Sequence, residues 1–289
     1  MKQPVFTGVC TALVTPFING SINYPMLRQL LRTQAQAGIR AFVLAGTTGE
    51  APTLTDGEKI ALFQKGREYA TPECRIIAGT GSNSTAHTIE LSIAAEAVGA
   101  DALLVVAPYY NKSNPEGLYA HFAAIAAAVK IPIILYNVPS RTGVDIPVSV
   151  YQKLATIPNI AGVKEASTDI TKITRIRAKC PKDFFVWSGN DDQIVPVISL
   201  GGQGVISVLS NVAPEETIMM TAAALDGDFD TAAALQCQLQ PLVEALFSEV
   251  NPIPVKSAMD LIGFDCGPCR LPLGTLSKDN YSNLKALLI

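Results

Sequence analysis

The chain has 289 residues, of which 48% are hydrophobic and 16% are charged, and its formal net charge is −3 at pH 7. A slightly acidic chain without a basic stripe is not expected to bind nucleic acid. The sequence has no run of about 18 uncharged apolar residues, and its first residues lack the apolar segment of a signal peptide. We therefore expect a cytoplasmic protein without membrane spans, whose apolar residues fill a large core.

Apolar runs rich in β-branched residues recur along the chain at nearly regular intervals. They predict eight buried strands, at residues 8–14, 41–44, 75–78, 102–106, 131–136, 160–164, 184–187 and 204–208. Segments with helical periodicity separate them, and two begin with capping signals, at Thr55 with Glu58 and at Asn114 with Pro115. This alternation favours an α/β fold, a closed (β/α)₈ TIM barrel.

The first predicted strand decides between a barrel and a doubly wound open sheet. A doubly wound sheet normally has a glycine-rich dinucleotide turn there, and residues 11–17 contain no glycine. The barrel repeat ends near residue 225. Residues 226–289 have helical patterns at 228–246, 255–262 and 278–288 and no flexible linker before them. We therefore predict a barrel at 1–225 and a helical extension at 226–289 that packs on it.

Lys164 follows directly on the apolar residues 160–163. An ammonium group is costly to bury, so burial favours the neutral amine, which is a nucleophile that forms a Schiff base with a carbonyl compound. Alternatively, the lysine stem packs in the barrel and its head pairs with a carboxylate such as Glu165. The strand alone leaves both interpretations open.

Polar and glycine-rich residues also follow the other predicted strands, where a barrel carries its chemistry. Among them are Thr47, Thr48, Tyr136 and Arg141. Each has an ordinary alternative role, in turn capping, barrel filling or surface solvation. Together with Lys164, however, they supply an amine, a hydroxyl relay for protons and a cation for a carboxylate, which is what Schiff-base chemistry requires.

No metal or cofactor is expected beyond a covalent Schiff base at Lys164. His87 and His121 lack metal-ligand spacing to acidic residues, and Cys266 and Cys269 have no second pair, so we interpret them as free thiols. The glycine clusters at 78–81 and 201–204 do not continue into a phosphate-loop motif, although a phosphate site near the last strand stays open.

Several motifs resemble the dihydrodipicolinate synthase family, within the pyruvate-dependent aldolase group that includes N-acetylneuraminate lyase. They are Gly-Thr-Thr-Gly-Glu at 46–50, Tyr-Asn-Val-Pro-Ser-Arg-Thr-Gly at 136–143, Val-Lys-Glu-Ala at 163–166, Ser-Gly-Asn-Asp at 188–191 and Asn-Pro-Ile-Pro-Val-Lys at 251–256. The similarity covers essentially the whole chain. It implies a lyase that condenses pyruvate with L-aspartate 4-semialdehyde to 4-hydroxy-tetrahydrodipicolinate, in lysine and diaminopimelate biosynthesis.

The resemblance also implies roles for individual residues. Lys164 forms the Schiff base, and Thr48 binds the pyruvate carboxylate. The proton relay runs from Tyr136 through Thr47 to a Tyr110 donated by a neighbouring subunit. The second substrate's carboxylate binds Arg141, while backbone groups of two further residues line the pyruvate pocket: Gly189 and Ile206. Family members are usually homotetramers built as dimers of dimers, so we expect the same assembly here.

A regulatory lysine site is implied as well, on Ala51, Asp56, Lys59, Asn83, His87 and Tyr109. In strongly inhibited members, the positions of Lys59 and His87 often hold histidine and glutamate. A carboxylate can pair with the ammonium of bound lysine, whereas Lys59 repels it. We therefore hypothesise weak or absent feedback inhibition.

Other activities use much of the same machinery. N-acetylneuraminate lyase or a 2-keto-3-deoxy sugar-acid aldolase would share Lys164, Tyr136 and the threonines. Arg141 and Tyr110 favour a compact anionic aldehyde over a long sugar. A barrel that binds a keto acid without turnover is a third hypothesis, and it has no need of a proton relay.

Overall fold

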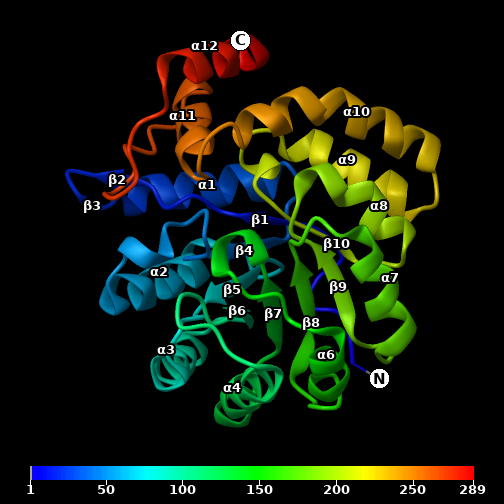
Figure 1. The fold of residues 1–289 in the computed structure, drawn as a ribbon. Helices are drawn as coiled ribbons and strands as arrows, with labels where there is room; N and C mark the ends of the chain where they lie inside the picture. The colour runs from blue at the N-terminus through cyan, green and yellow to red at the C-terminus, as the bar shows by residue number, and fades with distance from the viewer. Residues whose placement is uncertain (1) are drawn as a thin grey trace.

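The computed structural model describes residues 2–289 and shows a closed barrel of eight parallel strands (Figure 1). The strands are β1 (Gly8–Ala12), β4 (Ala41–Leu44), β5 (Arg75–Gly79), β6 (Ala102–Val106), β7 (Ile133–Asn137), β8 (Ile160–Glu165), β9 (Phe185–Ser188) and β10 (Gly204–Ser207). They follow chain order around the barrel, and β1 pairs with both β4 and β10 to close it. The predicted barrel is therefore confirmed.

Helices cover the outside of the barrel, and further helices follow it in the chain (Figure 1). Those between strands are α1 (Tyr24–Gln36), α2 (Asp56–Tyr69), α3 (Thr85–Ala97), α4 (Pro115–Ala128), α5 (Pro139–Thr142), α6 (Val148–Leu154), α7 (Ile170–Lys179) and α8 (Ile194–Ser199). Those after β10 are α9 (Pro214–Leu225), α10 (Phe229–Leu246), α11 (Ile253–Leu261) and α12 (Lys278–Leu288). Helix α10 packs against α8 and α9, and α12 packs against α10 and α11.

The predicted strand ends differ from the observed ones by one or two residues, for identifiable reasons. β1 ends at Ala12 rather than residue 14, because the Val14 N–H donates to the side chain of Asn211 instead of a neighbouring strand. β7 begins at Ile133 rather than residue 131, because the Ile131 N–H donates to a Glu96 carboxylate. Two short features were not predicted from the sequence: a small hairpin of β2 (Phe17–Ile18) with β3 (Ser21–Ile22), and the short helix α5.

Alternation along the strands separates two layers of apolar side chains. On β7, Ile134 and Tyr136 belong to the cluster inside the barrel, whereas Ile133 and Leu135 pack toward the helices. The register of β8 against β7 shifts by one residue between Ile133 and Ile134, which marks a bulge. The barrel interior is therefore a packed core rather than a channel, as this fold requires.

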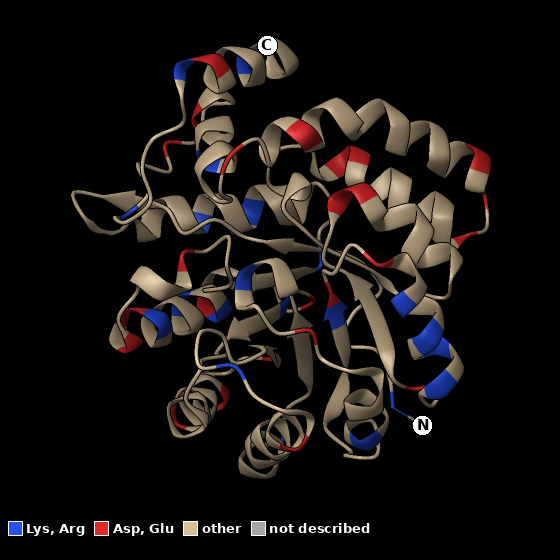
Figure 2. Ribbon diagram, in the orientation of Figure 1, with Lys and Arg blue, Asp and Glu red and all other residues tan. Residues whose placement is uncertain are grey.

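Charged side chains lie mainly on the helices and loops, and the strands carry few of them (Figure 2). β8 is an exception, because its last two residues, Lys164 and Glu165, are both buried. Among residues 2–289, no helix combines the length and the apolar character that a membrane crossing requires.

The buried imidazole of His121 predicts a stability loss in acid. His121 lies on α4, its Nδ1 is 2.9 Å from the Thr85 hydroxyl, and burial lowers its pKa from 6.5 to about 4. The unfolded chain therefore takes up a proton first, so the stabilising contribution is complete above the unfolded pKa and is lost as the pH falls from about 6.5 toward 4. The full loss is roughly 3 kcal/mol.

Urea unfolding at about pH 7 and about pH 4.5 measures this contribution. We expect His121→Gln to lose less stability than the unmodified protein between these pH values. His87→Gln, which removes the second, half-buried histidine, serves as the matched control and should keep the acid sensitivity of His121. Equal acid losses with and without His121 would show that its imidazole is not the cause.

Candidate active site

A cavity of about 190 Å³ opens at the carboxyl ends of the barrel strands, where polar loops meet. Its lining includes five residues that the sequence predicted to share a site with Lys164: Thr47, Thr48, Tyr136, Arg141 and Gly189. Lys164 itself also lines it. The structure therefore brings together side chains from β7, β8 and the loops after β4, β7 and β9.

Lys164 is 5% exposed and belongs to the inner face of β8. It pairs in register with Tyr136 on β7, and its Nζ lies 4.5 Å from the centroid of the Tyr136 ring. An amine this close to a ring face makes a cation–π contact when it is protonated. The geometry places the amine and the tyrosine on one wall of the cavity.

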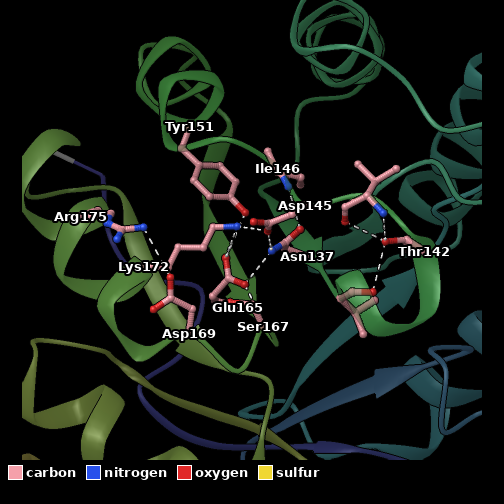
Figure 3. A network of polar contacts seen from close by, with 12 residues as sticks. Asn137, Thr142, Asp145, Ile146, Tyr151, Glu165, Ser167, Asp169, Lys172 and Arg175 are labelled. Atoms are coloured by element: carbon pink, nitrogen blue, oxygen red, sulfur yellow. Dashed lines mark hydrogen bonds and ion pairs between the residues drawn. The ribbon is translucent and has the colours of Figure 1, made fainter.

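Glu165 does not pair with Lys164, which removes the alternative of a packed lysine bound to its neighbour. Figure 3 shows the residues that surround the Glu165 carboxylate instead. Its carboxylate accepts hydrogen bonds from Asn137 Nδ2 at 2.7 Å and from the Tyr151 hydroxyl at 3.1 Å, and it lies 3.6 Å from Lys172 Nζ. Burial and the nearby Glu165 raise the pKa of Tyr151, so its phenol remains a donor.

This polar network also holds the segment after β7. Asp145 accepts hydrogen bonds from both Lys172 Nζ and Asn137 Nδ2, and the Ile146 N–H donates to Asn137 Oδ1 at 3.0 Å (Figure 3). The ends of β7 and β8 and helix α7 are thereby joined outside the barrel. Because α5, which carries Arg141, lies between Asn137 and Asp145, the network fixes both ends of that segment.

A buried ion pair holds the loop after β4, which carries Thr47 and Thr48. Glu50 and Lys256 are 1% and 2% exposed, and their Oε1 and Nζ atoms lie 2.9 Å apart. The second Glu50 oxygen accepts from the Arg270 backbone N–H at 2.9 Å. Glu50 has a φ of +57°, a left-handed conformation that costs energy for a residue other than glycine. Helix α11, through Lys256, and the connection between α11 and α12, through Arg270, therefore anchor the loop that carries Thr47 and Thr48.

Gly189 leaves room for the lysine stem. A Cβ at this position would lie 2.6 Å from the Ala166 Cβ and 3.1 Å from the Lys164 Cε, so any larger residue would clash with Ala166 and crowd the lysine stem. Ile206, in contrast, is fully buried inside the barrel and does not belong to the lining of the cavity. Of these two predicted pocket residues, the structure therefore places only Gly189 at the cavity.

Asp191 is a buried acid close to the site. Its Oδ2 accepts from the backbone N–H groups of Val208 and Leu209, both at 2.9 Å. Burial raises the pKa of Asp191, while these hydrogen bonds and the charge of Lys164 oppose the rise. Asp191 thus holds the loop after β10 against the end of β9.

A wider cavity of about 620 Å³ adjoins the first and shares Thr47, Tyr136 and Arg141 with it. Most of the predicted regulatory residues line this second cavity, namely Ala51, Lys59, His87 and Tyr109. Tyr110 also lines it, although its side chain is 90% exposed and its φ is +67°. Asn83 does not line it, and its carbonyl accepts from Asn111 Nδ2 at 2.9 Å.

Comparisons with known proteins decide the family. The chain matches the dihydrodipicolinate synthetase family over residues 5–289. It is 47% identical over 288 residues to a 4-hydroxy-tetrahydrodipicolinate synthase of Acetivibrio thermocellus, a match that covers 100% of this chain and 98% of the relative. The chain belongs to the dihydrodipicolinate synthetase family. The predictions of this family and of a lyase of the synthase type are therefore confirmed.

Solved structures of the dihydrodipicolinate synthetase family have the same fold. The dihydrodipicolinate synthase of Aquifex aeolicus is 42% identical with a TM-score of 0.96, over 98% of this chain and 97% of that one. A chloride-inhibited dihydrodipicolinate synthase of Acinetobacter baumannii, solved with pyruvate, is 40% identical with a TM-score of 0.96, over 98% of each chain.

Asn251 and Phe247 also line the smaller cavity, and sequence reasoning assigned them no role. Both lie between α10 and α11, after the last barrel strand in the chain. The signal that could have found Asn251 was its place at the start of the Asn-Pro-Ile-Pro-Val-Lys stretch, one of the motifs on which the family resemblance rested. The segment after the barrel therefore contributes directly to the cavity.

Proposed function

We propose that the chain condenses pyruvate with L-aspartate 4-semialdehyde to 4-hydroxy-tetrahydrodipicolinate, with Lys164 as the nucleophile. The observation that carries the proposal is the position of the Lys164 amine, buried at a small cavity beside Tyr136 and not paired with Glu165. A buried amine at the end of a barrel strand, surrounded by hydroxyl groups, is suited to Schiff-base formation.

In the first half of the reaction, Lys164 Nζ attacks C2 of pyruvate. The former carbonyl oxygen leaves as water after taking up protons, and an iminium remains. The hydroxyl groups of Tyr136 and Thr47 supply and remove these protons, while Thr48 donates to the pyruvate carboxylate. Loss of a proton from C3 of the bound pyruvate then gives a nucleophilic enamine. Thr47, Thr48 and Tyr136 all line the cavity that holds the amine.

In the second half, C3 of the enamine forms a bond with the aldehyde carbon of the semialdehyde, and the aldehyde oxygen takes up a proton from the relay. The amino group of this substrate then attacks C2, the bond from C2 to Lys164 Nζ breaks, and the ring closes with release of the lysine. Arg141 lines both cavities, and its planar guanidinium suits the carboxylate of the incoming semialdehyde.

We further propose a homotetramer built as a dimer of dimers, in which Tyr110 completes the relay of a neighbouring subunit. A tyrosine that is 90% exposed on a left-handed backbone position makes little contact within its own chain, which supports a role across an interface. The proposed location is the cytosol, where the six cysteine thiols stay reduced.

The choice of aldehyde is tested by measuring pyruvate consumption by the purified protein with each candidate. We expect consumption with L-aspartate 4-semialdehyde and none above background with N-acetylmannosamine. Arg141 favours the first aldehyde because a sugar without a carboxylate gives it no partner. Consumption with N-acetylmannosamine alone would replace the proposed synthase activity by that of a sugar-acid lyase.

Weak inhibition by free lysine follows from the side chains around Asp56. The His87 Nε2 lies 2.8 Å and the Lys59 Nζ 3.5 Å from the two Asp56 carboxylate oxygens. Hydrogen bonding from His87 is the main cause that lowers the pKa of Asp56. The carboxylate is therefore already engaged, and Lys59 repels an incoming ammonium. We expect initial rates to be nearly unchanged by millimolar lysine.

Substitution of Lys59 and His87 should make the protein sensitive to free lysine. His87→Glu combined with Lys59→His should introduce inhibition by lysine, because it removes the repelling Lys59 ammonium and places a carboxylate at position 87. Lys65→His, on the exposed face of α2, is the matched control and should not respond to lysine. A micromolar inhibition constant for the unmodified protein would contradict the expected weak inhibition.

A further inference from the structure

Asn251 occupies an unusual position between two substrate-binding groups. It lies after α10 and before α11, it lines the smaller cavity, and it is 5% exposed. Its Nδ2 donates to Thr48 Oγ1 at 3.1 Å, and its backbone carbonyl accepts from Arg141 Nη2 at 3.2 Å. One residue outside the strand repeat therefore contacts both groups to which the proposed mechanism assigns a carboxylate.

The contact with Thr48 constrains the direction of the threonine hydroxyl. A hydroxyl has one proton to donate and two lone pairs to accept with. When Asn251 Nδ2 donates to the oxygen, one lone pair is occupied and the hydroxyl proton stays available for another acceptor. Thr48 is 2% exposed and lines the cavity, so a group bound there is within the surroundings to which this proton is available. The contact with Asn251 thus leaves the Thr48 hydroxyl free to act as a hydrogen-bond donor.

The other end of the Asn251 amide supports a functional reason for this arrangement. Within residues 2–289, its Oδ1 is buried without a hydrogen-bond partner. An unsatisfied buried acceptor costs about 1–3 kcal/mol, and such groups in native proteins call for an explanation. A leucine or an alanine here would avoid this cost, but neither would donate to Thr48.

The segment that carries Asn251 is held in place independently. Lys256, one turn into α11, forms the buried ion pair with Glu50 and also donates to the Pro268 carbonyl at 3.1 Å. Glu50 lies two residues after Thr48, so the same loop is bound at two points. Asn251 therefore acts from a fixed position rather than from a mobile loop.

We propose that Asn251 is a positioning residue that fixes the Thr48 hydroxyl as a donor to the pyruvate carboxylate, through its side chain. Its backbone carbonyl separately supports Arg141. This inference rests on the proposed function, because it assumes pyruvate as the ligand of Thr48. The two contacts use different atoms of Asn251, so substitution of the side chain removes only the first.

Steady-state kinetics with both substrates separate the two contacts. Asn251→Ala should raise the KM for pyruvate about 10-fold, with less than a twofold change in the KM for L-aspartate 4-semialdehyde. Asn251→Asp should raise the pyruvate KM further, about 100-fold, because its carboxylate accepts the Thr48 proton and repels the substrate carboxylate. In a Thr48→Val background, Asn251→Ala should have no further effect on the pyruvate KM.

Asn159→Ala is the matched control, since Asn159 donates to two backbone carbonyls at the opposite end of β8. It should lower stability without separating the two KM values. Unchanged KM values, or equal rises in both, in the Asn251 variants would overturn the proposal. If the alanine variant does not fold, the isosteric aspartate variant decides by the same criterion. Borohydride trapping of pyruvate on the unmodified protein tests the underlying function separately, because it does not depend on Asn251.

Discussion

We expect Lys164→Ala to lower turnover by about 10⁴-fold or more, while the barrel remains folded. Lys164 is the group that forms a bond with the substrate in the proposed mechanism, and the described residues around the cavity hold no second lysine. The Lys164 amine makes no ion pair with Glu165, whose carboxylate lies near Lys172 instead. Removal of Lys164 therefore does not leave that buried carboxylate without a partner. Initial rates and the urea midpoint of unfolding, measured on the same preparation, check both parts.

Two further variants separate the nucleophile from its charge. Lys164→Arg keeps a cation beside the Tyr136 ring but supplies no amine that deprotonates, and it should be as inactive as the alanine variant. Lys153→Ala, at an exposed position on α6, should retain full activity. Substantial turnover in Lys164→Arg would mean that the positive charge, and not the nucleophile, is what the reaction needs.

Lys256→Met should have the largest effect on stability, with a loss of about 3–5 kcal/mol in the free energy of unfolding. Lys256 and Glu50 are both buried, and removal of the lysine leaves the Glu50 carboxylate without its cation. Turnover should fall as well, because Glu50 holds the loop of Thr47 and Thr48. Urea unfolding monitored by fluorescence of the buried Trp187 measures the loss.

Removal of both charges provides the control for this effect. The double variant Lys256→Met with Glu50→Gln should be more stable than Lys256→Met alone, because no unpaired charge remains buried. Lys65→Met breaks the exposed pair with Glu68 by the same substitution and should leave the stability nearly unchanged. A double variant as unstable as the single one would show that packing, and not charge pairing, explains the loss.

Local patterns in the sequence were sufficient for the barrel. Each strand is an apolar run with turn residues on both sides, and helix starts such as Thr55 with Glu58 carry their own hydrogen-bond signature, which the structure contains as a capping box. The lysine at the end of β8 and the threonines after β4 were placed in one cavity by the barrel geometry alone. These predictions depend on neighbours along the chain and on one rule of the fold.

Contacts between distant segments were not predictable in the same way. Nothing local shows that Glu165 binds Tyr151 and Lys172, or that Asn251 donates to Thr48, 203 residues away in the sequence. Such pairs depend on how the segments after β7 and after α10 pack on the barrel. The position of Ile206 on β10 was predicted, and its expected backbone contact with the pyruvate pocket stays a prediction.

Reductive trapping tests the central claim most directly. The protein is incubated with pyruvate and borohydride, digested, and analysed by peptide mass. We predict one adduct with the mass of reduced pyruvate on the peptide that contains Lys164, and none when pyruvate is omitted. Absence of the adduct, or its appearance on Lys172 or Lys256 instead, would contradict the proposal that Lys164 is the Schiff-base nucleophile.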